Sequence, residues 1–331
     1  MSKGRPGRPE KLGPLVDLVT QEEVDAYDNR EVPEVLSIKY LLNDQTEMPR
    51  MGYGLYQVPR SEAKALTLEA LKAGYRHLDC ASFYGNEAEV GEAIAESGIE
   101  RSELYVATKV WTDCIGAGPS AVKASIRKSL ELLKLDYVDC AYVHWPCPGH
   151  VEAYKAIEDL VLDEGVVKSI GLSNYRVQDY VRDIQPVMRV RPVVNQIEVN
   201  PWLYRKQCVE HFANLAIRTV AYKPLLRGKA MTKDPKLGEI AKDMDCTPAQ
   251  ALLRWAIDKG FIVLPRSTDP GRIRENIHIN RLKFIQPHMT YLSNLTNEDA
   301  ITDYEEHFKK RAIVDPDNPT LPLYGGGGGA S

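Results

Sequence analysis

Strand-like and helix-like hydrophobic patterns alternate along most of this chain, with little sequence between them. The strand-like runs are GYGLYQV (52–58), YRHLDCA (75–81), LYVATKVW (104–111), VDCAYVHW (138–145), SIGLSNY (169–175), PVVNQIEV (192–199), RTVAYKPL (218–225) and FIVLPRS (261–267). The segments between them have apolar residues at i, i+3 and i+4, and many end in glycine. Examples are SEAKALTLEALKAG (61–74), EAEVGEAIAESG (87–98), SAVKASIRKSLELLKL (120–135), VEAYKAIEDLVLDEG (151–165) and PAQALLRWAIDKG (248–260). Eight such β-then-α units predict the α/β class and a closed (β/α)8 barrel.

An open doubly wound sheet is the alternative to a barrel. It is disfavoured because no G-x-G-x-x-G follows a strand: GYGLYQV lacks the third glycine and continues as a strand. The segment LSIKYLLNDQTEMPRMGYG (36–54) precedes the first unit and has the pattern of a β-hairpin. We expect this hairpin to close the floor of the barrel.

Both ends of the chain differ in composition from the barrel segment, predicted to span residues 34–315. Residues 1–33 are polar and are predicted to form an extension, and residues 316–331 are predicted to form a flexible glycine-rich tail. The run KGRPGRP (3–9) resembles an arginine hook for the minor groove of DNA. A solvated tail is the simpler interpretation, because the run occurs once in an acidic protein.

The overall charge and the cysteines argue against several classes of partner and compartment. The formal net charge is −4 and the calculated pI is about 6.0, so there is no global positive field to attract nucleic acid or an anionic membrane. No apolar run reaches membrane-spanning length, and the first residues contain no signal-peptide core. The six scattered cysteines form no C-x-x-C motif, which favours reduced thiols and a cytoplasmic protein without metal. Cys80 is expected to be a small buried side chain rather than a redox group.

Polar side chains recur where the predicted strands end. In a (β/α)8 barrel the C-terminal strand ends form one face, where active sites are built. The candidates on this face are Asp79, Tyr84, Lys109, His144, Ser173, Asn174, Gln196, Tyr222, Lys223, Arg266 and Ser267. Asp79 and Tyr84 lie in GYRHLDCASFYGNE, where an aspartate could equally cap a local turn.

Four of these candidates form a chemically coherent group. Lys109 lies in an apolar strand, where its charge is costly unless it pairs with Asp79 or snorkels out from an edge. A cation near the phenol of Tyr84 is expected to lower the tyrosine's pKa and so make it a better proton donor. His144 would orient a bound carbonyl, although a lone histidine in a strand is often only a core residue. This group could protonate an alkoxide that forms during hydride transfer, which implies a bound cofactor as hydride donor.

The last strand and its neighbours offer a place for a nucleotide cofactor. In IVLPRSTDPGRIREN (262–276), Arg266, Ser267 and Arg272 lie close together and could bind a phosphate, although they could equally be solvated charges. Tyr222 offers a flat face for a nicotinamide ring. Ser173, Asn174 and Gln196 can hydrogen-bond its carboxamide.

These segments resemble those of the aldo-keto reductase superfamily over about residues 37–280. The matching motifs are GYRHLDCASFYGNEAEVG, ATKVW, YVHWP, GLSNY, VVNQIEVNP and LPRSTDPGRIREN. The resemblance implies a catalytic tetrad of Asp79, Tyr84, Lys109 and His144, with Tyr84 as general acid. It implies NADPH-dependent reduction of aldehydes and ketones, with NADH as a second cofactor to be considered. The cofactor contacts it implies are Ser173, Asn174, Gln196, Tyr222, Lys223, Leu225, Arg266, Ser267, Thr268, Arg272, Glu275 and Asn276.

Several positions depart from the family pattern. Arg266 replaces the usual lysine, Lys223 replaces a serine, and Tyr56 replaces a tryptophan. Asp269 places a carboxylate near the expected 2′-phosphate of the cofactor, where it could repel NADPH or accept bonds from the ribose hydroxyls of NADH. The aromatic residues expected to line the substrate pocket are Tyr56, Phe83, Trp111 and Trp145. The short loop after residue 225 favours small or polar carbonyl substrates, including aldoses.

Two other functions remain open from the sequence. A family member can bind nucleotide as a regulatory or structural subunit without turnover. A barrel hydrolase or isomerase would need paired carboxylates or metal ligands at strand ends, where only Asp79 and Glu198 are available. A monomer is the family's commonest state for this chain length, with a dimer as the alternative.

Overall fold

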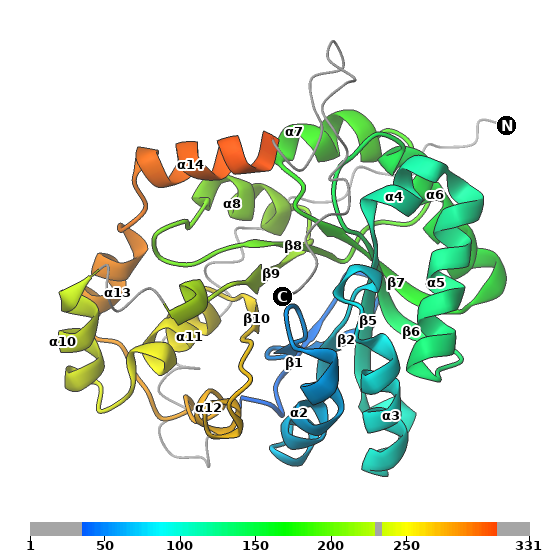
Figure 1. Cartoon of the computed structure of the whole chain (residues 1–331). Helices are drawn as coiled ribbons and strands as arrows, with labels where there is room; N and C mark the ends of the chain where they lie inside the picture. The colour runs from blue at the N-terminus through cyan, green and yellow to red at the C-terminus, as the bar shows by residue number, and fades with distance from the viewer. Residues whose placement is uncertain (1–34, 229–233, 310–331) are drawn as a thin grey trace, which may run out of the picture.

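Eight parallel strands form the centre of the computed structural model, which describes residues 35–228 and 234–309 (Figure 1). The predicted extension at 1–33 and the predicted tail at 316–331 lie outside the described residues. Each strand pairs with its neighbours in sequence order, from β3 to β10. The strands are β3 (Tyr53–Gly54), β4 (His77–Asp79), β5 (Tyr105–Val110), β6 (Val138–Val143), β7 (Val167–Ser173), β8 (Val194–Glu198), β9 (Arg218–Tyr222) and β10 (Ile262–Leu264).

The two outer strands of this sheet meet and nearly close it into a barrel. Met51 and Val263 form a parallel bridge between the β3 and β10 segments. Gly52 N donates to the Val263 carbonyl at 2.9 Å, and Gly54 N donates to the Pro265 carbonyl at 3.0 Å. A side chain at Gly52 would not fit, because its Cβ would lie 2.6 Å from the buried His77 ring. The predicted (β/α)8 barrel is therefore confirmed, and an open sheet is excluded.

Helices surround the barrel on its outer side (Figure 1). Five match the quoted helical patterns: α2 (Arg60–Lys72), α3 (Glu87–Ser97), α5 (Pro119–Leu133), α6 (His150–Asp159) with the π-helical turn η5 (Leu160–Glu164), and α11 (Pro248–Asp258). The others in the described part of the chain include η3 (Ser82–Tyr84), α4 (Thr112–Ala117), α7 (Val177–Asp179), η6 (Tyr180–Ile184), α8 (Lys206–Asn214), α10 (Pro235–Asp243), α12 (Pro270–Glu275), α13 (Gln286–Ser293) and α14 (Glu298–Lys309). None of the helices in these two ranges is both long and apolar enough to cross a membrane.

Local sequence explains where these helices begin and which face they bury. In α5, Pro119 occupies the first turn, and Val122, Ile126 and Leu133 face the core at helical spacing. In α11, Thr247 and Gln250 form a reciprocal capping box, in which each side chain bonds the other's backbone N–H. The capping residues therefore account for where these helices begin, and the hydrophobic periodicity accounts for the face that they bury.

An antiparallel hairpin of β1 (Lys39–Leu41) and β2 (Glu47–Pro49) covers one end of the barrel. Leu42 and Met48 are buried in the same cluster as the barrel residues Val194 and Ile262. Asn43 Nδ2 donates to carbonyls that lie just before β8 and β9, at Pro192 and Ala216. The hairpin thus closes the N-terminal floor as predicted, which leaves the C-terminal strand ends open.

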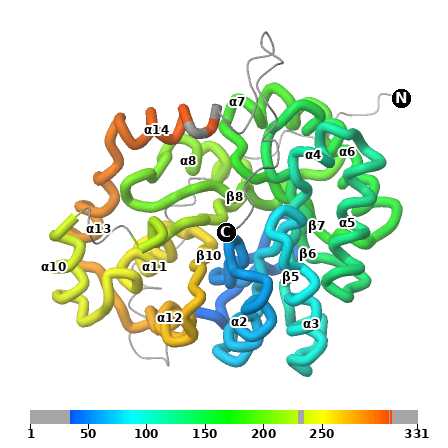
Figure 2. Tube along the Cα trace, viewed as in Figure 1, coloured from blue at the N-terminus to red at the C-terminus, as the bar shows by residue number. Residues whose placement is uncertain are grey.

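The C-terminal helix α14 runs beside α8 and reaches the region of α7 (Figure 2). Glu305 lies 3.5 Å from the Arg176 guanidinium, and the Tyr304 hydroxyl accepts a bond from Arg205 at 3.0 Å. The Phe308 ring lies 5.9 Å from the ring of Trp145, which follows β6. Helix α14 therefore packs against Trp145, which lies at the open C-terminal end of the barrel.

The six cysteines are all unpaired. Burial raises the pKa of the Cys80 thiol well above its usual range, and the side chain is fully buried. The structure therefore gives Cys80 the character of a packing residue rather than a reactive thiol.

Candidate functional site

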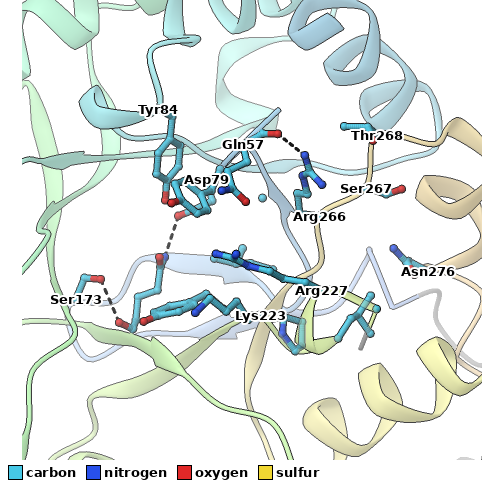
Figure 3. Close-up of a pocket in the computed structure, with 18 of the residues that line it drawn as sticks. Gln57, Asp79, Tyr84, Ser173, Lys223, Arg227, Arg266, Ser267, Thr268 and Asn276 are labelled. Carbon is cyan, nitrogen blue, oxygen red and sulfur yellow. Dashed lines mark hydrogen bonds between the residues drawn. The ribbon is translucent and has the colours of Figure 1, made fainter. Parts of the chain in front are cut away.

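A pocket of about 1000 Å³ opens over the C-terminal ends of the strands (Figure 3). Every candidate residue named from the sequence lines it except Lys109, which lies beneath the wall. The lining candidates are Asp79, Tyr84, His144, Ser173, Asn174, Gln196, Tyr222, Lys223, Leu225, Arg266, Ser267, Thr268, Arg272, Glu275, Asn276, Tyr56, Phe83, Trp111 and Trp145. Residues from all eight β-then-α units are thus gathered at one end of the barrel, as the strand-end rule predicts.

Lys109 lies within β5 and is only 1% exposed. Its ammonium donates three hydrogen bonds, to Asp79 Oδ1 at 2.7 Å, to the Cys80 carbonyl at 2.8 Å and to the Tyr84 hydroxyl at 3.1 Å. Three bonds use all the donors that an ammonium group has. The buried charge is therefore paired with a carboxylate and held in one position, and the snorkelling alternative is wrong.

The local backbone turns Asp79 and Tyr84 toward the same point. Asp79 is the last residue of β4, and Tyr84 ends the short helix η3 just before Gly85, whose φ of 69° few other residues adopt without strain. Asp79 accepts from Lys109 and from Gln196 Nε2 at 2.8 Å, and η3 has no side-chain cap. The local capping interpretation of Asp79 is therefore wrong.

The expected lowering of the Tyr84 pKa is also wrong. Burial, followed by the nearby Asp79 carboxylate, raises the pKa of Tyr84 well above 10. The Lys109 cation does not reverse this, because its charge is already balanced by Asp79 at 2.7 Å. The phenol consequently keeps its proton at neutral pH, which is the state a proton donor requires.

His144 lies just beyond β6 and is 8% exposed. Burial and then the Lys109 charge hold the pKa of His144 well below its usual range, so the ring is neutral. Its Nδ1 is buried and has no hydrogen-bond partner among the described residues. Its ring packs edge-on against Trp111 with a centroid distance of 4.8 Å. The neutral ring can donate one N–H bond to an oxygen atom in the pocket.

The amide and hydroxyl groups beside the tetrad form a bonded cluster. Asn174 Nδ2 donates to the His144 carbonyl at 3.0 Å, and the Tyr222 hydroxyl donates to Asn174 Oδ1 at 2.7 Å. Ser173 Oγ donates to the Gln196 carbonyl at 3.2 Å. Asn174 has a φ of 64°, which asparagine tolerates better than most residues and which directs its side chain into this cluster.

The loop after β9 contributes a basic side chain to the same rim. Lys223 Nζ lies 2.6 Å from Glu198 Oε2, so its charge is paired in the structure. Glu198 is the last residue of β8. Lys223 is therefore held close to the pocket by a neighbouring strand end.

The opposite end of the pocket is formed by the loop after β10 and by α12. Arg266 donates to the carbonyl of Gln57, which follows the adjacent β3 segment (Figure 3). The Ser267 hydroxyl accepts from Asp269 N at 3.0 Å, and Asp269 Oδ1 accepts from Arg272 N at 3.0 Å. With Glu275, which also lies in α12, this end therefore contains two arginines and two carboxylates among the pocket-lining residues.

Two further predicted residues lie on this side. Glu275 Oε1 accepts from the Thr247 hydroxyl at 2.6 Å, so one of its oxygens is already used. Asn276 is 3% exposed, and its side-chain amide has no hydrogen-bond partner within residues 35–228 and 234–309. The amide faces the pocket, where water or a ligand can supply the partner that the protein does not.

Aromatic rings form the wall beside the tetrad. Phe83 and Trp111 stack at 3.7 Å with an interplanar angle of 16°. Tyr56 packs against Tyr84 at 5.2 Å, and Trp145 also faces the pocket. The rings offer flat apolar surface next to polar groups, which is typical of small-molecule pockets.

Several lining residues, mainly on loops and helices, are not among those predicted from the sequence. They are Gly54, Gln57, Thr112, Asp113, Pro224, Arg227, Gly228, Leu237, Pro248, Ala249, Leu252 and Leu264. Leu237 and Leu252 have ordinary core periodicity in α10 and α11, so no local signal distinguishes them. The glycine that ends LLRG (225–228) after β9 is the one turn signal that could have identified Arg227.

Three comparisons agree on a family. The model of the aldo/keto reductase family matches residues 50–296. An aldo-keto reductase of Mycolicibacterium vanbaalenii is 40% identical over 258 residues, which are 77% of this chain and 91% of that protein. The crystal structure of an aldo/keto reductase from Brucella melitensis is 38% identical and has a TM-score of 0.73, covering 78% of this chain and 99% of that one.

A second solved structure includes a nucleotide. The aldo-keto reductase of Bombyx mori in complex with NADP has a TM-score of 0.73 and 30% identity, covering 82% of this chain and 98% of that chain. Together with the barrel and its pocket, these matches show that the chain belongs to the aldo/keto reductase family, whose members are NAD(P)H-dependent oxidoreductases acting on carbonyl groups.

Proposed function

We propose that this protein reduces small or polar aldehydes and ketones, aldoses among them, to alcohols with NADPH, and that Tyr84 is the general acid. The observation that carries the proposal is the environment of the Lys109 ammonium. It bonds Asp79 Oδ1, the Cys80 carbonyl and the Tyr84 hydroxyl at the pocket wall. A phenol beside a fixed, charge-balanced cation is suited to transfer of a proton to a developing alkoxide.

Each side chain of the group has a distinct task. The cofactor, when bound, supplies the hydride. Tyr84 donates its proton to the carbonyl oxygen as negative charge develops there, and its raised pKa keeps that proton available. Lys109, at 3.1 Å, stabilises the phenolate that remains. Asp79 holds the ammonium in place, and neutral His144 donates a hydrogen bond that orients the carbonyl.

The pocket fits a dinucleotide in size and in polar groups. Its volume of about 1000 Å³ lies at the upper end of the usual range for ligand pockets. Asn276 supplies an unsatisfied amide at one end, and Ser173, Asn174 and Gln196 lie beside the tetrad at the other. Arg266 and Arg272 lie at the Asn276 end, where phosphate groups would gain from their charge.

The substrate class follows from the wall beside Tyr84. The stacked Phe83 and Trp111 rings suit flat carbon skeletons or the apolar faces of sugars. Asp113 lies on the same wall and can accept hydrogen bonds from substrate hydroxyls. Small aldehydes that combine a ring or chain with hydroxyl groups therefore match the pocket best.

The test follows NADPH oxidation by its absorbance, with an aromatic aldehyde and with an aldose. Tyr84→Phe removes one oxygen and is expected to lower kcat by about 10²–10⁴-fold, with little change in the Kd for NADPH. Tyr137→Phe removes the same atom from a ring that packs under Arg101 outside the pocket, and it serves as the matched control. Turnover that survives in Tyr84→Phe would contradict the proposal.

Wild-type protein that binds NADPH without any turnover would instead favour a nucleotide-binding regulatory or structural subunit. Size-exclusion chromatography would test the predicted monomer against a dimer. The predicted cytoplasmic location is tested by microscopy of the tagged full chain.

A further inference from the structure

The pocket end formed by the β10–α12 wall has the features of a site for a polar ligand. We use this name for Arg266, Ser267, Asp269, Arg272 and Asn276. The Asn276 amide is nine-tenths or more buried, lines the pocket, and has no partner in the described part of the chain. Figure 3 shows it in the wall near Ser267 and Thr268. The amide is therefore free to bond a polar ligand in the pocket.

Asp269 gives this wall a fixed negative charge. Its Oδ1 accepts from Arg272 N, and its own backbone N donates to Ser267 Oγ. These two bonds hold the carboxylate in the pocket wall. No arginine or lysine among residues 35–228 and 234–309 forms an ion pair with it, so its charge is not cancelled by direct contact.

One of the two arginines of this wall already bonds the neighbouring rim. The Arg266 guanidinium donates to the carbonyl of Gln57, which follows β3, the strand that meets β10 where the barrel closes (Figure 3). A phosphate bound at the β10–α12 wall would share Arg266 with this carbonyl. It would also meet the Asp269 carboxylate, which has the same sign of charge.

A ribose with a free 2′-hydroxyl meets neither difficulty. Its hydroxyl can donate a hydrogen bond to Asp269 Oδ2, and carboxylates are strong acceptors for such bonds. Arg272 still favours a phosphate, so the two charged groups act in opposite directions on a 2′-phosphate. From these opposed charges we infer that Asp269 reduces the discrimination between a 2′-phosphate and a free 2′-hydroxyl. The protein can therefore bind and use NADH as well as NADPH.

This inference rests on the proposed function, which places the adenosine end of the cofactor at the β10–α12 wall. The expected ratio of the Kd values for NADH and NADPH in the wild-type protein is about tenfold or less, which corresponds to about 1.4 kcal/mol. Both nucleotides should also support carbonyl reduction.

The test measures binding of NADPH and of NADH by quenching of tryptophan fluorescence, without substrate. Asp269→Asn keeps a capping oxygen for Arg272 N but removes the charge. It is expected to tighten NADPH binding by about tenfold and to leave NADH binding unchanged or about twofold weaker. Asp269→Ser is the second neutral variant, in case the first is poorly folded. Asp163→Asn, on the exposed outer turn η5, is the matched control and should change neither Kd.

Three outcomes would overturn the inference. The first is a wild-type preference for NADPH of more than about a hundredfold, and the second is an equal change of both Kd values in Asp269→Asn. The third is a failure of both nucleotides to bind. Binding of both nucleotides without turnover would leave the effect of Asp269 on binding standing, and would overturn the reductase proposal together with the use of NADH in turnover.

Discussion

Lys109 Nζ lies 2.7 Å from Asp79 Oδ1, and both side chains are almost completely buried, Asp79 in the pocket wall and Lys109 beneath it. The two residues come from neighbouring strands, since β4 pairs with β5 in parallel. The pair joins stability to chemistry, because the same ammonium that balances Asp79 also contacts the Tyr84 hydroxyl. The effects of mutation on folding and on activity should therefore separate in a double-mutant cycle.

Either single variant of the pair leaves a buried group without its counter-charge. Lys109→Met and Asp79→Asn are each expected to lower the free energy of unfolding by about 3–5 kcal/mol. The double variant should lose clearly less than the sum, because neither charge remains. Turnover should be lowered in all three, because Lys109→Met and the double variant remove the cation beside Tyr84 and Asp79→Asn leaves it without its counter-charge. Urea unfolding and kcat measure the two effects, and additive losses of stability would contradict this account.

The pH dependence of reduction follows from the directions of two pKa shifts. The protonated phenol exists at every pH below the raised pKa of Tyr84, and neutral His144 exists above its lowered pKa. The kcat for carbonyl reduction should therefore be flat from about pH 6 to about pH 9. Oxidation of an alcohol needs the phenolate as base, so its rate should rise with pH. A reduction rate that falls steeply above about pH 7 would place the phenol pKa near neutrality.

The sequence was sufficient to predict which side chains meet, but it could not predict all their bonds. The barrel topology brings Asp79 to Lys109 across 30 residues and to Gln196 across 117 residues. Once the strands are assigned, this convergence follows from the common direction of their C-terminal ends. The pKa of Tyr84 could not be predicted in the same way, because its direction depends on burial and on the distance to the Asp79 carboxylate.

Two physical reasons explain why the sequence did not predict the remaining pocket residues. Gln57 takes a positive φ of 59° without being glycine or asparagine, so no turn signal marks its position, and Arg227, with a φ of 55°, is marked only by the glycine that follows it. Leu237, Ala249 and Leu252 lie on helices whose periodicity is satisfied equally by a core and by a pocket wall. Only the packed structure separates these two cases.

The stacked rings of Phe83 and Trp111 should determine affinity for aromatic aldehydes. Trp111→Leu removes one face of the stack and is expected to raise KM for an aromatic aldehyde by about tenfold, with a smaller change for a short aliphatic one. Tyr137→Leu is the control, because that ring packs under Arg101 outside the pocket. Equal increases for both substrates would indicate a general disturbance of the pocket instead.

Close packing between α3 and α5 predicts a stability difference between two glycines. A Cβ at Gly91 would lie 2.7 Å from Leu133 Cα and would also meet the Leu132 carbonyl, so the helix backbones would have to separate. Gly91→Ala is therefore expected to lower the free energy of unfolding by at least about 2 kcal/mol. Urea denaturation of the purified variant measures this loss.

Gly238 supplies the matched control, because the same substitution there meets no atom of the described residues within 4 Å. It lies inside α10, where alanine restricts the unfolded chain more than glycine does and favours the helix. Gly238→Ala should thus raise the free energy of unfolding by about 0.5–1 kcal/mol. If both variants changed stability in the same direction, helix propensity rather than helix contact would control the Gly91 position, and the close approach of α3 to α5 would be wrong.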